Sequence, residues 1–142
     1  MDSQTTVAGQ TIFPAFRYVN ARAAIEWLQR AFDARTHVVY DSPDGTVAHA
    51  ELTIAGNMIM LGHSRDDGYA IRSPKEVGVA TASIYVVLPD ASAVDALHQR
   101  AVSAGAKITN APYDTDHGSH DFSAEDLEGN RWAFGTYSPA SA

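Results

Sequence analysis

Polar side chains occupy every second position of one β-rich segment, residues 47–54. His49, Glu51 and Thr53 alternate there with small or apolar residues. Because a strand directs successive side chains to opposite faces, the three share one face. If that face lines a cleft, His49 can act as a general base whose ring Glu51 orients; if it meets solvent, the stripe is an ordinary polar surface. Both interpretations stay open, and His49 and Glu51 are the candidates for catalysis.

A second group of ionisable side chains lies in the stretch DTDHGSHD, residues 114–121. It places His117 and His120 among three aspartates, which are residue types that bind divalent metal ions. Ligands on a loop, however, need rigid strands or helices to make them converge. We therefore interpret the stretch as a polar turn, with a metal site as the less favoured alternative. His63, at the end of a predicted strand, is interpreted as a rim residue.

Composition excludes several other kinds of chemistry. The 142 residues carry 10 Lys and Arg against 17 Asp and Glu, a net charge of −7. This charge disfavours nucleic acids and anionic membranes as partners and favours cationic or neutral small molecules. Because cysteine is absent, the chain has no thiolate nucleophile, disulfide or Cys-bearing metal site. No nucleophile elbow, phosphate-binding loop or His-Glu-x-x-His pattern is present.

The chain also lacks an apolar run near the roughly 18 residues of a membrane span, and its N-terminus lacks the basic and then apolar pattern of a signal peptide. A cytoplasmic localisation is therefore expected.

The elements that position these side chains occur twice along the chain. Matching positions 70 residues apart are Asn20 and Asp90, Trp27 and Leu97, and Arg30 and Arg100. Two glycine turns, at Gly56 and Gly129, are 73 residues apart. One such unit has too few elements to close a core alone, so we expect the two copies to pair and leave a cleft between them.

Each copy is predicted to have the element order βαβββ. In the first, Asn20 caps a helix over 21–32, and strands are expected at 11–19, 36–40, 47–54 and 58–63. In the second, Asp90 caps a helix over 91–104, with strands at 81–88, 107–110, 119–124 and 131–137. The predicted organisation is one structural domain, divided into a disordered tail 1–10, a first module 11–63, a crossover 64–80 that is a candidate lid, a second module 81–137 and a tail 138–142.

Two tandem βαβββ units with an Asp-Leu-Glu-Gly-Asn turn at 126–130 resemble the vicinal oxygen chelate superfamily, which includes glyoxalase I, extradiol dioxygenases, fosfomycin-resistance enzymes and bleomycin-resistance proteins. The chain most resembles the small glyoxalase/bleomycin-resistance-like members. The segments that carry the resemblance are GTVAHAEL (45–52), MIMLG (58–62), PYDTD (112–116) and DLEGNRW (126–132). The resemblance spans residues 11–137 and implies an α+β fold, two modules forming curled mixed sheets, and a homodimer.

The resemblance also identifies where a metal ion would be held. In catalytic members, His and Glu from the first and last strands of each module bind the ion. At the family's spacing from the helix caps and the turn glycines, the corresponding residues here are Phe13, Met60, Ser83 and Ala133. None of them, apart from the weak hydroxyl of Ser83, is a ligand for a divalent ion. The resemblance therefore implies that the usual metal site is absent, and no cofactor is expected.

Strand alternation from those four positions predicts a ligand cavity of aromatic, thioether and hydrogen-bonding side chains. The predicted ligand-binding residues are Phe13, Arg17, His49, Glu51, Met60, Ser83, Tyr85, Tyr113 and Arg131. This composition suits a planar or hydrophobic organic molecule. Arg17 or Arg131 can fix a ligand carboxylate, although a surface ion pair is the simpler role for either.

Three functions follow, in order of preference. The first is metal-independent binding of a small organic molecule, similar to the bleomycin-resistance-like proteins that act by sequestration. The second is a glyoxalase-like lyase, isomerase or dioxygenase with an atypical metal site built from His49, Glu51 and either His120 or His63. The third is a module that binds and regulates a protein partner. Whether the chain is an enzyme stays open, with the binding role preferred.

Overall fold

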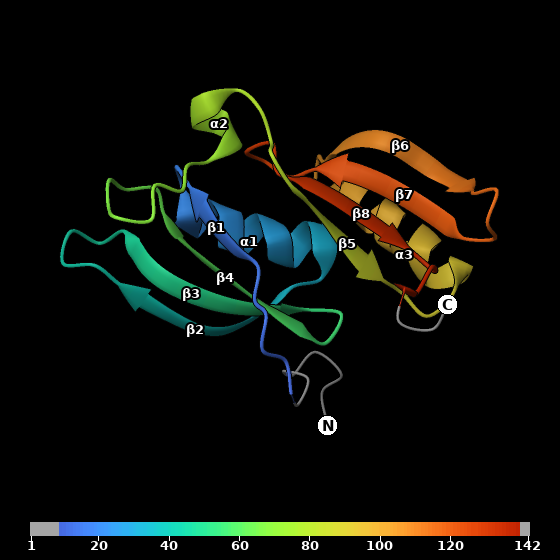
Figure 1. Cartoon of the computed structure of the whole chain (residues 1–142), viewed down its shortest axis with the longest axis horizontal. Helices are drawn as coiled ribbons and strands as arrows, with labels where there is room; N and C mark the ends of the chain where they lie inside the picture. Colours follow the sequence, from blue (N-terminus) through green and yellow to red (C-terminus); the bar gives the residue numbers. More distant parts are fainter. Residues whose placement is uncertain (1–8, 140–142) are drawn as a thin grey trace.

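The computed structural model describes residues 9–139, which form two four-stranded sheets and two long helices (Figure 1). The strands of the first sheet are β1 (Ala15–Tyr18), β2 (Arg35–Asp41), β3 (Val47–Ile54) and β4 (Asn57–His63). Those of the second sheet are β5 (Ser83–Val87), β6 (Lys107–Asp114), β7 (His120–Glu125) and β8 (Arg131–Gly135). The helices are α1 (Ala21–Phe32) and α3 (Ala91–Ser103), with a short α2 (Pro74–Val77) between the sheets.

The two sheets have the same topology. Their strand orders are β1-β4-β3-β2 and β5-β8-β7-β6. In each sheet the first strand pairs in parallel with the last, and the remaining pairs are antiparallel. The predicted α+β fold of tandem βαβββ units is therefore confirmed.

Both long helices begin at the predicted caps. The Asn20 side chain accepts a hydrogen bond from the Ala23 amide at 3.1 Å, and the Asp90 side chain accepts one from the Ala93 amide at 2.8 Å. Each bond satisfies an amide that the first turn of a helix leaves without a partner. The two helices contact each other as well as their own sheets, so each unit closes on the other.

Aromatic rings from both units meet in one core. The Phe32 ring, at the end of α1, has its centroid 5.2 Å from that of Trp132 and 4.8 Å from that of Phe134, both on β8. Phe16 of β1 stacks on Trp132 at 5.5 Å. Trp132 and Phe134 are almost completely buried, so both belong to this core.

The first strand is shorter than the predicted strand at 11–19, and β1 begins only after Pro14. Proline has no amide hydrogen to donate to a ladder, but the Pro14 carbonyl accepts from the Met60 amide at 2.9 Å. Strand β6 is longer than predicted, because residues 111–114, expected in a loop, continue to pair with β7. Most of the expected N-terminal tail lies outside the described residues, but Gln10 hydrogen bonds to both backbone groups of Met58.

The crossover was predicted without a helix, but it contains α2. Ser73 caps this single turn by accepting from the Lys75 amide at 3.2 Å, and Glu76 accepts from the Ser73 amide at 3.1 Å. The turn ends at Gly78, whose φ of 83° is in the left-handed region that glycine adopts readily. Within residues 9–139 no helix is both long and apolar enough to cross a membrane.

Candidate functional site

The face of the first sheet that points away from the core carries the polar stripe. Leu52 and Leu61 are buried in the core, so strand alternation turns their neighbours Glu51 and Met60 to the other face. Glu51 and Met60 are also register partners across β3 and β4. Glu51 and Met60 therefore lie side by side on the outer face of β3 and β4.

A cavity of about 330 Å³ lies on this face, and we call it the Arg17 cavity. Its walls include Arg17, His49, Met60, Arg65, Tyr69 and Ile71. The first three come from β1, β3 and β4, and the last three come from the crossover, which therefore closes one side of the site.

A smaller cavity of about 180 Å³ adjoins it, because Arg17 lines both. This second space lies between β1 and β5 and includes Ser83, Arg131 and Arg72 in its lining. The two cavities thus bring together five of the nine predicted ligand-binding residues around one guanidinium. The crossover residues Arg65, Tyr69 and Arg72 were not predicted.

The other four predicted residues have different surroundings. Phe13 precedes β1 and lines neither cavity. The Tyr85 hydroxyl donates to Asp121 at 3.2 Å and accepts from the Tyr137 amide at 3.2 Å, within a local hydrogen-bond network. Tyr113 is half exposed on β6.

Glu51, the fourth of these residues, lines neither cavity but contacts His49. The His49 Nε2 atom is 2.8 Å from a Glu51 carboxylate oxygen, and the imidazole stacks on the Tyr40 ring at 6.3 Å. The carboxylate fixes the orientation of the ring, as the sequence predicted. His49 is the member of the pair that lines the cavity.

The residues of the atypical metal site do not converge. His120 is on β7 of the second sheet, where its two ring nitrogens lie 2.7 Å from Asp95 and 2.7 Å from Asp114. Hydrogen bonds to Asp95 and then to Asp114 raise the pKa of this imidazole above its ordinary value. Within residues 9–139 no three His, Asp or Glu side chains are grouped so that they could hold a metal ion.

The positions that bind metal in the resembled family do not fit a divalent ion either. They hold Phe13, Met60, Ser83 and Ala133, which offer neither imidazole nor carboxylate.

Arg17 has the most unusual surroundings in the site. Its side chain is only 10% exposed, and Nη2 donates to the Asp67 carboxylate at 3.0 Å. The other terminal nitrogen, Nη1, is buried and has no hydrogen-bond partner among residues 9–139. An unpaired polar group in the interior costs about 1–3 kcal/mol, and more when it is charged. The Tyr69 ring lies over the guanidinium, with its centroid 5.9 Å from Cζ.

The crossover is held against the cavity by a chain of arginine contacts. Arg65 donates to the Ala48 carbonyl at 3.1 Å and its Nε lies 3.3 Å from the Asp67 carboxylate. Gly62 makes room for this crossing, because a Cβ there would lie 2.7 Å from the Ala48 oxygen and 3.4 Å from Arg65 Nη1. Arg72 in turn donates to the Arg65 carbonyl at 2.8 Å.

Asp67 links this chain to Arg17. Burial alone would raise the pKa of the Asp67 carboxyl, but hydrogen bonds from the Tyr69 amide and Arg17 hold it below its ordinary value. The carboxylate is therefore charged at neutral pH and is shared between Arg17 and Arg65.

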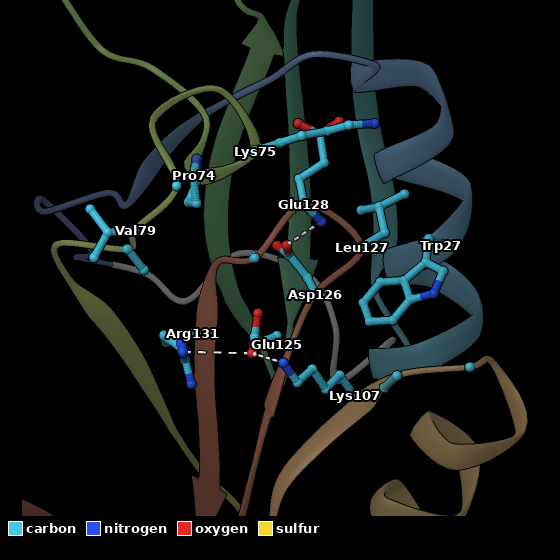
Figure 2. Close-up of a pocket in the computed structure, with 15 residues that line it drawn as sticks. Trp27, Pro74, Lys75, Val79, Lys107, Glu125, Asp126, Leu127, Glu128 and Arg131 are labelled. Atoms are coloured by element: carbon cyan, nitrogen blue, oxygen red, sulfur yellow. Dashed lines mark hydrogen bonds and ion pairs between the residues drawn. The ribbon is translucent and has the colours of Figure 1, made fainter.

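Another cavity, of about 630 Å³, lies beside α1, α2 and the turn at 125–130. Figure 2 shows Glu125 of this cavity between Lys107 and Arg131, at 3.2 and 3.6 Å. Asp126 is also satisfied, because it accepts from the Tyr18 hydroxyl at 2.7 Å.

Glu128, in the same turn, is equally well satisfied. It accepts from the amides of Val19 and Asn20 at 2.7 and 2.9 Å and from the Ser73 hydroxyl at 2.6 Å. Asp126 and Glu128 thus join the second unit to the first, and Glu128 also joins it to the crossover. Because their hydrogen bonds are already made within the chain, we assign them a structural role and take the cavities around Arg17 as the candidate site.

Comparisons with known proteins agree with this architecture. The model of the Glyoxalase/Bleomycin resistance protein/Dioxygenase superfamily matches residues 13–134. An uncharacterized protein of Mycobacterium bovis, Mb0911c, is 33% identical over 121 residues, which are 82% of this chain and 76% of the relative.

Solved structures are similar over most of the chain. TioX from Micromonospora sp. ML1 has a TM-score of 0.70 at 25% identity, covering 89% of this chain and 94% of TioX. The fosfomycin resistance protein FosX from Mesorhizobium loti has a TM-score of 0.65 at 14% identity, covering 95% and 97%. A glyoxalase I mutant from Zea mays has a TM-score of 0.69 at 18% identity, covering 91% of this chain and 46% of that one. The last two similarities concern the fold alone.

Proposed function

The chain belongs to the Glyoxalase/Bleomycin resistance protein/Dioxygenase superfamily, and from this premise we propose that it binds a small organic molecule in the Arg17 cavity without a metal ion. The observation that carries the proposal is the cavity itself. Its volume of about 330 Å³ is near the lower end for small-molecule sites, which are mostly apolar with a few convergent polar groups. Met60 and Ile71 supply apolar surface, and Arg17 and His49 supply the polar groups.

Metal independence is supported by the donor set. A divalent ion needs imidazole or carboxylate ligands aimed from fixed strands. The corresponding positions present a phenyl ring, a thioether, a hydroxyl and a methyl group, at Phe13, Met60, Ser83 and Ala133. Binding therefore depends on direct contacts with the side chains of the cavity.

Thermal unfolding with a panel of small organic molecules tests the proposal. A ligand of the native state raises the melting temperature as its concentration rises, and we expect the same rise with and without EDTA. Met60→Trp should abolish it by filling the cavity. Val102→Trp, on the exposed surface of α3, is the control and should keep it. A response that disappears with EDTA, or that survives Met60→Trp, would contradict the proposal.

Elemental analysis of protein purified without chelator tests the enzyme alternative. A lyase, isomerase or dioxygenase with an atypical site would contain about one divalent ion per chain, and His49→Ala would remove it, because each ligand contributes to affinity. A regulatory module would instead retain a protein partner and respond to neither ligand nor metal.

The homodimer that the resemblance implies stays a prediction, which light scattering can test.

A further inference from the structure

We propose that the molecule bound in the Arg17 cavity carries a carboxylate, and that this group pairs with Nη1 of Arg17. The inference rests on the proposed function and adds the chemical class of the ligand to it. It departs from what the net charge favours, because the charged side chains that line the cavities are arginines.

The first support is the charge of the two adjoining cavities. The chain as a whole carries −7. The charged side chains in the lining of the two cavities are nevertheless Arg17, Arg65, Arg72 and Arg131, with no Asp or Glu. Each of these arginines has an acidic partner, but the partners lie outside the lining. A ligand in the cavities therefore meets guanidinium groups before carboxylates, which suits an anion.

The second support is the hydrogen bonding of Arg17. Its Nη2 is paired with Asp67, whereas its buried Nη1 has no partner. Asp67 also pairs with Arg65 at 3.3 Å, so one carboxylate is shared by two guanidinium groups. A second carboxylate would balance the remaining charge and give Nη1 an acceptor. The planar guanidinium group of arginine matches the geometry of carboxylate oxygens better than the ammonium group of a lysine does.

The third support is the apolar surface beside the guanidinium. Met60 and Ile71 line the cavity, and the Tyr69 ring lies over Arg17 although it is 77% exposed. Since Nη1 is enclosed, the ligand reaches it when Tyr69 and its neighbours in the crossover move aside. An aromatic body can then replace Tyr69 against the guanidinium while its carboxylate binds Nη1. The expected ligand class is therefore an aromatic carboxylic acid.

Calorimetry with three probes of one shape tests the inference. The probes are 2-naphthoate, the neutral 2-naphthamide and the cationic 2-naphthylmethylammonium. Because only the acid forms an ion pair with the Arg17 guanidinium, whereas the amide offers a neutral acceptor, we expect the acid to bind on the order of tenfold more tightly than the amide. The cation should bind most weakly.

Variants show whether Arg17 causes the preference. Arg17→Met should weaken acid binding much more than amide binding, so that the acid and the amide bind with similar affinity. Asp67→Asn should strengthen acid binding, because it removes the carboxylate that already occupies the guanidinium. Arg17→Lys, which keeps the charge but not the planar fork, should fall between wild type and Arg17→Met. If Arg17→Met does not fold, the acid affinities of Asp67→Asn and Arg17→Lys show whether Arg17 causes the preference.

The outcomes separate the inference from the proposed function. If the amide or the cation binds as tightly as the acid, or if acid affinity is the same in all the folded variants, the inference is wrong and the proposed function stands. If none of the three probes binds, the inference is wrong, and the thermal-unfolding panel decides the proposed function separately.

Discussion

Arg17 and His120 show how much the surroundings of a residue decide its role. Arg17 was a possible partner for a ligand carboxylate or a surface ion pair, and it proves to be buried with one nitrogen unpaired. His120 was a possible metal ligand, and both of its ring nitrogens are bonded to aspartates from α3 and β6. Asp67 and Asp95 are distant in sequence from the residues that they pair with, so residue type alone did not distinguish the roles.

The His120 bridge predicts a dependence of stability on pH. Hydrogen bonds to Asp95 and Asp114 raise the pKa of His120 in the folded state. The bridge is therefore fully stabilising below the ordinary histidine pKa of about 6.5 and is lost as pH rises through the raised value. We expect the free energy of unfolding, measured in urea at pH 5.5 and 8.5, to change less with pH in His120→Asn than in the wild type. His117→Asn is the control, and equal pH dependence in all three proteins would contradict the role of the bridge.

At the scale of elements, the turn at 126–130 does more than connect β7 to β8. The family resemblance identified it as a turn before the last strand, and its backbone does form that connection. Its buried carboxylates also hold the start of α1 and the residue that caps α2. These contacts join residues as far apart as Val19 and Glu128, so no local pattern in the sequence contains them.

Removing Glu128 should destabilise the protein strongly. Glu128→Ala leaves the Val19 and Asn20 amides and the Ser73 hydroxyl without their acceptor, and we expect a loss of about 2–4 kcal/mol in the free energy of unfolding. Glu125→Ala in the same turn removes only ion pairs with exposed cations and should cost about 1 kcal/mol or less. Urea denaturation measures both. Equal losses would show that Glu128 is not the link between the elements.

Local signals did predict much of the fold. Asn20 and Asp90 cap their helices because capping involves only a residue and the amides three positions later. Alternation predicted the pairing of His49 with Glu51, since it depends on one strand alone. Sequence missed α2 and the crossover residues of the site. Arg65 and Asp67 lie in a stretch without periodicity, and their positions depend on contacts with other strands.

The whole molecule is held together by aromatic packing between the two units. Phe32 belongs to the first unit, but its ring packs on Trp132 and Phe134 of the second. The repeat in the sequence predicted that the copies pair because neither closes a core alone, and the shared core agrees with this reason. The smaller cavity beside the Arg17 cavity depends on that pairing, because strands of both units line it.

A shared core predicts a single cooperative unfolding transition. Far-ultraviolet circular dichroism and tryptophan fluorescence should therefore give coincident curves in urea. Phe32→Ala should lower the free energy of unfolding by about 3–5 kcal/mol and keep the transition single. Tyr40→Ala, at an exposed ring of β2, is the control with a small effect. Two separate transitions, in wild type or in the variant, would show that the units fold independently.

The central claim is that side chains around Arg17, and not a metal ion, hold a small molecule. A crystal structure of the protein grown with 2-naphthoate and Mn²⁺ tests it most directly. We expect the acid to lie in the Arg17 cavity, with a carboxylate oxygen in hydrogen-bond contact with Nη1 and no metal ion between them. A manganese ion bound by His49 and Glu51, with the acid as its ligand, would contradict it.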